Sequence, residues 1–354
     1  MDQKSDKTFK GNYFEDFTIG QILNHATPRT VTEGDVALYT ALYGPRFALQ
    51  SSDEFAHNSG YECAPLDDML TFHIVFGKTV PDISINAVAN LGYADCKFLK
   101  PVYPGDTLSA VSEVIGLKEN SSGKNGNVFV RTTGSNQAGE VVLQYVRWVM
   151  VNKKDPASPA PETVIPDLPE AVAASDLTVP EGLDFSGYDA VLAGSPYFWE
   201  DYEPGEKINH VDGMTIEAAD HMMATRLYQN TAKVHFNLHM MKDGRLGERI
   251  VYGGHVISLA RGLSFNGLGN AALIAAINGG RHVNPCIAGD TVYAWTEVLD
   301  RAEIGGRSDV GALRVRLVAT KDHEPADHAY KDDDGKYLPS VLLDLDLWLL
   351  LPRR

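Results

Sequence analysis

Two short stretches in the second half of the 354-residue chain carry residue types that suit proton transfer and anion stabilisation. His235 follows Asn230 by five residues. An imidazole is the side chain whose ordinary pKa suits a general base near neutral pH, whereas an amide only donates and accepts hydrogen bonds. Gly253 and Gly254 precede His255 at the start of an apolar segment. Glycine N–H groups at a helix N-terminus are open to a ligand oxygen, as an oxyanion hole requires.

These stretches belong to a chain that repeats itself. The segment PCIAGDTVYAWTEV, residues 285–298, matches PVYPGDTLSAVSEV, residues 101–114, at seven of fourteen positions and an offset of 184. The segments 14–25 and 199–210 match at an offset of 185. Repeats at a constant offset are the signature of one structural unit used more than once. The sequence therefore predicts two copies of one fold.

Each copy is predicted to contain one apolar central helix followed by antiparallel strands. In the first copy the helix MLTFHIVFGKTV follows Asp67 and Asp68, whose charges suit the positive end of a helix dipole. In the second copy the helix VISLARGLSFNGL follows the Gly253–His255 stretch. Strands then run on either side of a Gly-Asp turn in both copies. The fold class is α+β, with two tandem units that each wrap an antiparallel sheet around a long apolar helix.

A short helix is predicted ahead of the first central helix. Thr32 and Asp35 offer a capping box at its start, and Gly44 marks its end. A further helical turn is expected between Asp53 and Ser59.

A proline-rich segment separates the two copies. Residues 153–195 contain prolines at 156, 159, 161, 166, 169 and 180 among Ala, Ser, Glu and Asp. Such composition is typical of a linker, and its length favours a path along the surface. The predicted units are therefore an N-terminal one at residues 1–152 and a C-terminal one at residues 196–354.

The two copies differ where the chemistry would lie. His235 stands opposite Gln50, and the glycine pair takes the place of the pair Asp67 and Asp68. Differences between copies indicate a function given to one of them, so we expect the second copy to be catalytic. A structural histidine at position 235 is the alternative interpretation.

Composition excludes several classes of partner. The net charge of −16 disfavours nucleic acid and anionic membranes. No apolar run of membrane-spanning length and no leader-like N-terminus is present, which predicts a cytoplasmic protein. The three cysteines, Cys63, Cys96 and Cys286, lack the paired spacing of metal ligands, so we expect no metal.

Four long stretches resemble one known family. The chain is similar to the double hot-dog hydratases of the MaoC-like, hydratase 2 group, and the resemblance covers nearly all of it. The stretches that carry the similarity are RTVTEGDVALYTALYGPRFALQSSDEFA, PDISINAVANLGYADCKFLKPVYPGDTL, TRLYQNTAKVHFN and YGGHVISLARGLSFNGLGN. The resemblance implies two tandem hot-dog units and the reversible addition of water to an enoyl-CoA. It also implies a non-catalytic first copy that shapes the acyl pocket.

The family's motif G-D-x-N-P-x-H is altered in this chain. His235 matches the motif's His, but Asn230 occupies the Asp position, and Ala232 and Lys233 occupy the Asn and Pro positions. His235 is then the expected base, with Asn230 orienting the water or the thioester. Gly254 and His255 would stabilise the enolate through their N–H groups. Glu217 or Asp220 could replace the missing carboxylate, although both suit the start of a helix better.

The resemblance is closest to hydratases of a branched dicarboxylic enoyl-CoA, whose free carboxylate needs a cation. Arg226 and Arg261 are the first candidates because a guanidinium binds a carboxylate through two hydrogen bonds. The whole predicted substrate-binding set is Arg226, Arg261, Lys233, Tyr228, Tyr252 and Gly253. Coenzyme A enters as part of the substrate, no other cofactor is expected, and a homo-oligomer, most simply a dimer, is anticipated. A hot-dog acyl-CoA thioesterase and a non-catalytic CoA-binding scaffold are the alternatives.

Overall fold

The computed structural model describes residues 7–354. The helices and strands of the first half are η1 (Phe14–Asp16), β1 (Ile22–Thr30), α1 (Glu33–Tyr43), α2 (Ala48–Ser51), α3 (Asp53–Asn58), α4 (Asp68–Ile83), β2 (Ala87–Phe98), β3 (Thr107–Glu119), β4 (Asn125–Ser135) and β5 (Val141–Asn152). The linker contains η2 (Ala174–Asp176) and α5 (Ala190–Ala193). The second half contains η3 (Trp199–Asp201), β6 (Lys207–Thr215), α6 (Ala218–Leu227), α7 (Lys233–Phe236), α8 (Leu238–Met241), α9 (Gly253–Leu263), α10 (Phe265–Leu268), β7 (Leu273–His282), β8 (Thr291–Glu303), β9 (Val310–Lys321) and β10 (Val341–Pro352).

The short helices of the first half lie where local sequence signals place them. Thr32 caps α1 by accepting a hydrogen bond from the Asp35 N–H, and the capping box is complete. The helix ends at Gly44, which adopts the left-handed conformation with φ of 55°. The turn predicted from Asp53 to Ser59 is present as α3. These predictions are confirmed because they depend only on contacts between neighbouring residues.

The two central helices begin differently. The Asp67 side chain caps α4 by accepting a hydrogen bond of 2.8 Å from the Met69 N–H. Tyr252 precedes α9 and provides no side-chain cap. The second helix is also shorter than predicted. It ends at Leu263, and Gly267, with φ of 106°, interrupts the turn that follows. No helix within residues 7–354 combines the length and hydropathy needed to cross a bilayer.

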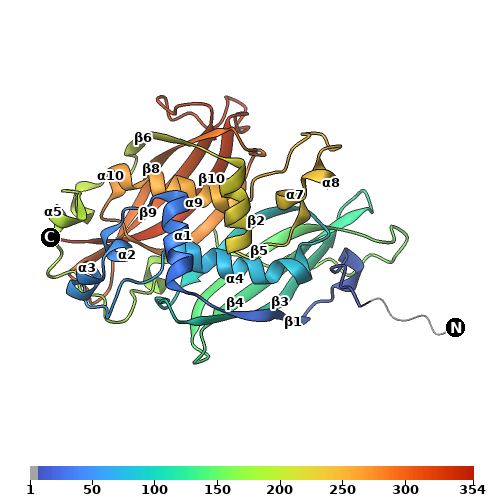
Figure 1. Ribbon diagram of the computed structural model, residues 1–354, viewed down its shortest axis with the longest axis horizontal. Helices are drawn as coiled ribbons and strands as arrows, with labels where there is room; N and C mark the ends of the chain where they lie inside the picture. The colour runs from blue at the N-terminus through green and yellow to red at the C-terminus, as the bar shows by residue number, and fades with distance from the viewer. Residues whose placement is uncertain (1–6) are drawn as a thin grey trace.

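The two halves share one antiparallel sheet. Its ten strands run in the order β1-β3-β4-β5-β2-β7-β10-β9-β8-β6, so the same order occurs outward from the centre in each half. At the centre β2 pairs with β7, with Tyr93 opposite Gly280 and Cys96 opposite Ile277. Figure 1 shows the sheet behind the helices, with α4 and α9 lying across it. The duplicated α+β architecture is confirmed, and the two predicted sheets are continuous with each other.

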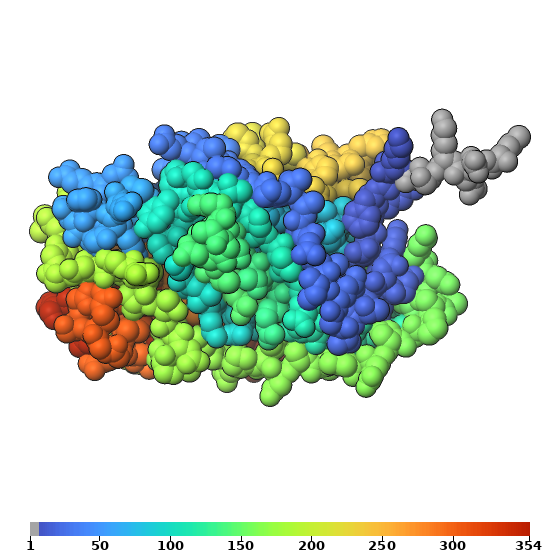
Figure 2. Space-filling model, turned by 90° about the horizontal axis from the view of Figure 1, so that it is seen from below, coloured from blue at the N-terminus to red at the C-terminus, as the bar shows by residue number. Residues whose placement is uncertain are grey.

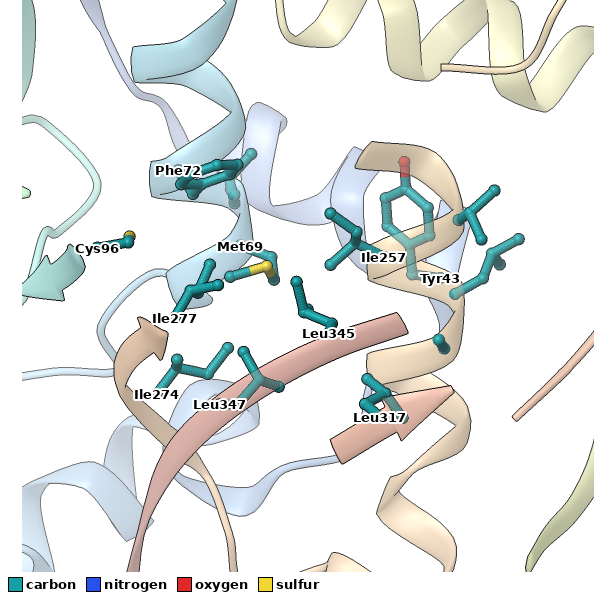
Figure 3. Close-up of a cluster of buried hydrophobic side chains, with 14 of the residues drawn as sticks. Tyr43, Met69, Phe72, Cys96, Ile257, Ile274, Ile277, Leu317, Leu345 and Leu347 are labelled. Carbon is teal, nitrogen blue, oxygen red and sulfur yellow. The ribbon is translucent and has the colours of Figure 1, made fainter. Parts of the chain in front are cut away.

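The apolar core is shared as well. Met69 and Phe72 of α4 lie in the same buried cluster as Ile257 of α9 and Leu345 and Leu347 of β10. Figure 3 shows these side chains between the central helices and the strands of the second half. Because each half buries its helix partly against the other, the two copies form one packed body.

The linker runs over the surface and is packed down at several points. Figure 2 shows residues 153–195 as a light green band along one face of the molecule. Val164 forms an isolated antiparallel bridge with Leu117. Leu183 and Phe185 are buried, and the Val172 N–H donates to Asn278 Oδ1 at 2.9 Å. The expected surface path is therefore observed, and the linker also contributes apolar side chains to the core.

Candidate active site

A cavity of about 260 Å³ lies where the two halves meet. Most of its wall is apolar. Both halves contribute to the wall, among others Phe76, Asn90, Tyr93 and Arg147 from the first, and Asn230, His235, Tyr252, Gly253 and His282 from the second. A small, mainly apolar cavity with a few converging polar groups is the usual form of a site for a small ligand.

A short helix brings His235 to this cavity. The four-residue helix α7 follows Asn230, which is 5% exposed. Asn230 Oδ1 accepts a hydrogen bond of 3.0 Å from the Ala232 N–H. This side-chain turn orders the chain just before α7 and leaves the Nδ2 group of Asn230 as its available donor. The two residues singled out in the sequence thus share one wall.

The imidazole of His235 is neutral. Its Nδ1 lies 2.9 Å from the carbonyl oxygen of Ile250, which can only accept, so Nδ1 carries the proton. Burial lowers the pKa of His235 from 6.5 to about 4, although the hydrogen bond to Ile250 opposes the shift. Nε2 then holds a lone pair at neutral pH. This is the state a general base requires.

The uncapped N-terminus of α9 borders the same cavity. Gly253 and Gly254 are its first two residues, and amides at these positions have no acceptor within the helix. Gly253 lines the cavity, and a Cβ atom there would lie 2.3 Å from Cε1 of His282. The His255 N–H, by contrast, donates to the Tyr252 carbonyl at 2.9 Å. The His255 N–H of the predicted pair is therefore already bonded, and Gly254 is buried and does not line the cavity, so Gly253 is the donor that this N-terminus offers to the cavity.

A second histidine lies on the cavity wall. His282 Nε2 is 3.0 Å from the Tyr93 hydroxyl. Burial lowers the pKa of His282 to about 4. His282 has no signal in the sequence repeat. It ends β7, and its position opposite Gly253 depends on a helix and a strand that are distant in sequence.

One cation lies on the cavity wall. Arg147 of β5 is fully buried, and its guanidinium lies 4.3 Å from the centre of the Phe76 ring. Burial lowers its pKa. The sequence does contain a signal for it. Positions 141, 143, 145, 149 and 151 are apolar or aromatic on one face of β5, and Arg147 is the charged exception.

Comparison with known proteins agrees with this geometry. The family model described as mesaconyl-CoA hydratase matches residues 1–331. The chain belongs to the mesaconyl-CoA hydratase family. It is 64% identical over 350 residues to the β-methylmalyl-CoA dehydratase of Chloroflexus aurantiacus, covering 99% of each chain. It is 62% identical over 347 residues to the mesaconyl-CoA hydratase of Cereibacter sphaeroides, covering 98% of this chain and all of that protein.

Solved structures give the same assignment. A MaoC domain dehydratase of Chloroflexus aurantiacus superposes with a TM-score of 0.97 at 64% identity, over 99% of this chain and 100% of that one. A Mycobacterium tuberculosis protein with a double hot-dog fold superposes with a TM-score of 0.74 at 23% identity, over 97% and 99%. This member of the mesaconyl-CoA hydratase family is therefore a double hot-dog protein and a hydro-lyase.

Two predicted site residues of this hydratase lie outside the cavity, in a buried network. The Tyr228 hydroxyl donates to the Tyr43 hydroxyl at 2.8 Å, and the Tyr43 hydroxyl lies 3.0 Å from His255 Nδ1. Tyr228 and His255 are almost completely buried and do not line the cavity. Their side chains join α1 to the second half. The predicted contact of Tyr228 with substrate is therefore wrong for this cavity.

The three predicted cations also lie elsewhere. Arg261 is buried in the core, where Nη1 donates to Ser264 at 3.0 Å, Nη2 donates to the Ala271 carbonyl, and the guanidinium stacks on Phe47. Arg226 is exposed and lines an outer groove together with Asn230. Lys233 is exposed on α7. Nearness in sequence was a poor guide because helical periodicity turns these side chains away from the cavity.

No carboxylate described in residues 7–354 lines the cavity. Glu217 is the N-cap residue of α6, and Asp220 lies in its first turn. Both therefore occupy the helix-start positions that the sequence favoured for them. The family's Asp is not replaced at this wall by either residue.

Proposed function

We propose that the protein catalyses the reversible hydration of mesaconyl-CoA to β-methylmalyl-CoA. One observation carries the proposal: a neutral histidine, His235, and Gly253 at the uncapped N-terminus of α9 line one cavity. Hydration of an enoyl thioester needs these two elements, a base for water and a donor for the carbonyl oxygen. The substrate follows from the names of the two relatives that are more than 60% identical.

In this proposal His235 activates the water. Asn230 Nδ2 donates to the water oxygen, and His235 Nε2 accepts one of its protons. The oxygen bonds to the β-carbon as the double bond shifts toward the carbonyl. Since no described carboxylate lines the cavity, the imidazolium returns the proton to the α-carbon. One water is added in total.

The N-terminus of α9 stabilises the intermediate. Negative charge gathers on the thioester oxygen as water adds. The N–H group of Gly253 and the positive end of the helix dipole suit an oxyanion at this point. Loss of one such donor typically costs about 3 to 4 kcal/mol of transition-state stabilisation.

His235→Ala tests the base. We expect kcat for mesaconyl-CoA hydration to fall by about two to four orders of magnitude with the circular dichroism spectrum unchanged. Gln50→Ala is the matched control, because Gln50 occupies the same place in α2 as His235 in α7. Gln50 Nε2 donates to the Ala272 carbonyl at 2.9 Å, so its loss should cost about 1 kcal/mol of stability and little activity.

The assay also separates the other two classes of function. Loss of the conjugated double bond is followed by ultraviolet absorbance, and free CoA by a thiol reagent. Hydration removes the absorbance without releasing thiol. Release of thiol would assign a thioesterase, and binding without either change would assign a CoA-binding scaffold. Turnover by folded His235→Ala equal to that of the unmodified enzyme would remove His235 from the mechanism.

A further inference from the structure

The cavity wall contains a buried cation with no counter-charge. Arg147 is 0% exposed. Among the carboxylates of residues 7–354, none forms an ion pair with it. A buried charge without a partner is costly, so such a group is normally met by an anion. The protein itself provides none here.

The guanidinium retains free hydrogen-bonding capacity. Nη2 donates to Thr79 Oγ1 at 2.7 Å, and Nη1 approaches Asn90 Oδ1 at 3.5 Å. Nε is buried without an acceptor. An arginine carries five N–H donors, so most of them have no protein acceptor. Its planar fork matches the two oxygens of a carboxylate.

A second unpaired donor lies on the same wall. Asn90 lines the cavity, and its Nδ2 group is also buried without an acceptor. Its Oδ1 faces Arg147, which leaves Nδ2 available for a different acceptor. Two neighbouring buried groups that both lack an acceptor indicate an anionic ligand rather than an accident of packing.

The remaining wall would not by itself select a charged ligand. Phe76, Val149 and Val256 are apolar, and the two cavity histidines are neutral because burial lowers their pKa values to about 4. Arg147 is therefore the group on this wall that distinguishes a charged acyl end from an apolar one.

We infer that Arg147, assisted by Asn90, binds a free carboxylate on the acyl group and so selects dicarboxylic over monocarboxylic acyl-CoA substrates. The inference rests on the proposed function, because that function places an acyl-CoA in the cavity. The first half then supplies the anion receptor and the second half supplies the base and the oxyanion donors. Arg147 is a specificity residue that acts through binding.

Binding of unreactive acyl-CoAs tests this without any turnover. Succinyl-CoA and butyryl-CoA have acyl chains of equal length, and succinyl-CoA alone bears a carboxylate. Neither has a double bond to hydrate. By calorimetry we expect the unmodified protein to prefer succinyl-CoA and Arg147→Met to lose at least about thirtyfold of that preference. Arg131→Met, on the neighbouring strand β4 and outside the cavity, is the matched control.

The possible results of these measurements distinguish the inference about Arg147 from the proposed function. A preference retained by folded Arg147→Met, or lost equally in Arg131→Met, would overturn the inference, as would the absence of any preference in the unmodified protein. A merely structural role predicts lower stability with the preference intact. If Arg147→Met does not fold, Arg147→Gln removes the charge while still able to donate to Thr79, and it must also lose the preference. Failure of mesaconyl-CoA hydration with the preference intact would overturn only the proposed function.

Discussion

The N-termini of α4 and α9 occupy equivalent places in the two halves. The N-terminus of α4 is capped by side chains, whereas that of α9 is uncapped and borders the cavity. At α4 the Asp67 carboxylate accepts from the Met69 N–H, and the Asp68 carboxylate accepts from the Ile274 N–H at 2.7 Å. At α9 the N-cap residue is Tyr252, which provides no side-chain cap, and the first helical residue is Gly253. The space beside Asp68 is about 10 Å³, against about 260 Å³ beside Gly253. A helix dipole alone does not make a site, because its amides must also be exposed to a cavity.

The linker helps to close the first copy. Thr178 and Pro180 line the small space beside Asp68, together with Leu273 and Leu350 from the second half. Asp67 also supplies charge that partly compensates buried Arg261. The acidic pair therefore contributes to packing in the first half, whereas Gly253 leaves space for a cavity in the second.

In strands β5 and β10 the first half carries the charged residue and the second half carries the apolar one. Aligning Trp148 with Trp348 places Arg147 opposite Leu347. Leu347 packs among Ile274, Ile277 and other apolar side chains, as Figure 3 shows. Arg147 instead lines the cavity. At this pair of positions the residue is apolar where the strand packs in the core and charged where the strand meets the shared cavity.

Among the substitutions in this comparison, Gly253→Ala should reduce kcat/KM the most. The new Cβ atom would lie 2.3 Å from Cε1 of His282, so the ring or the helix N-terminus must move. A displacement of about 1 Å at reacting groups costs about a hundredfold in rate, and we expect that loss in kcat/KM. The measurement is steady-state hydration of mesaconyl-CoA, with folding checked by circular dichroism.

Gly305→Ala is the control for this change, because a Cβ atom there meets nothing within 4 Å. Unchanged kinetics in Gly253→Ala would mean that the open N-terminus of α9 takes no part in the reaction.

Features that depend on neighbouring residues could be predicted from the sequence, whereas features that depend on contacts between distant residues could not. Thr32, Asp35 and Gly44 were informative because capping depends on neighbouring residues. Comparison of the two copies drew His235 out of the sequence, and the structure places it on the cavity wall with Asn230. Arg261 was misassigned because its core location depends on Phe47 and on α4, which are distant in sequence. Arg147 was not predicted although strand alternation marks it as an inward charge, because it is distant in sequence from the His235 motif.

Asp68→Asn should change how the free energy of unfolding depends on pH. Burial raises the pKa of Asp68 from 3.8 to about 8. The folded protein therefore holds a proton that the unfolded chain releases between those pH values, and the free energy of unfolding falls as pH rises through this window. The slope is at most about 1.4 kcal/mol per pH unit. Asp68→Asn keeps an acceptor for the Ile274 N–H and should flatten that dependence.

Urea unfolding at several pH values between 5 and 8 measures this slope. Asp333→Asn changes an exposed carboxylate and should leave it unaltered. An identical pH dependence in Asp68→Asn and the unmodified protein would show that Asp68 is ionised in the folded state, and that its neutral form does not help to close the first copy.

The smallest expected effect concerns Asn230, where the family motif has a carboxylate. With His235 as the base and its pKa lowered to about 4, kcat/KM should rise through that pH as the imidazole loses its proton. Asn230→Asp would place a carboxylate on the same wall and favour the imidazolium, raising its pKa by about 1 to 3 units. The ascending limb should then move to higher pH, while activity near neutrality changes little. Asn24→Asp adds the same charge at an exposed position of β1 and should leave the profile unmoved. If the ascending limb of the pH profile stays in place in folded Asn230→Asp, residue 230 does not neighbour the base. The second copy would then work without the pair Asn230 and His235 that distinguishes it from the first copy.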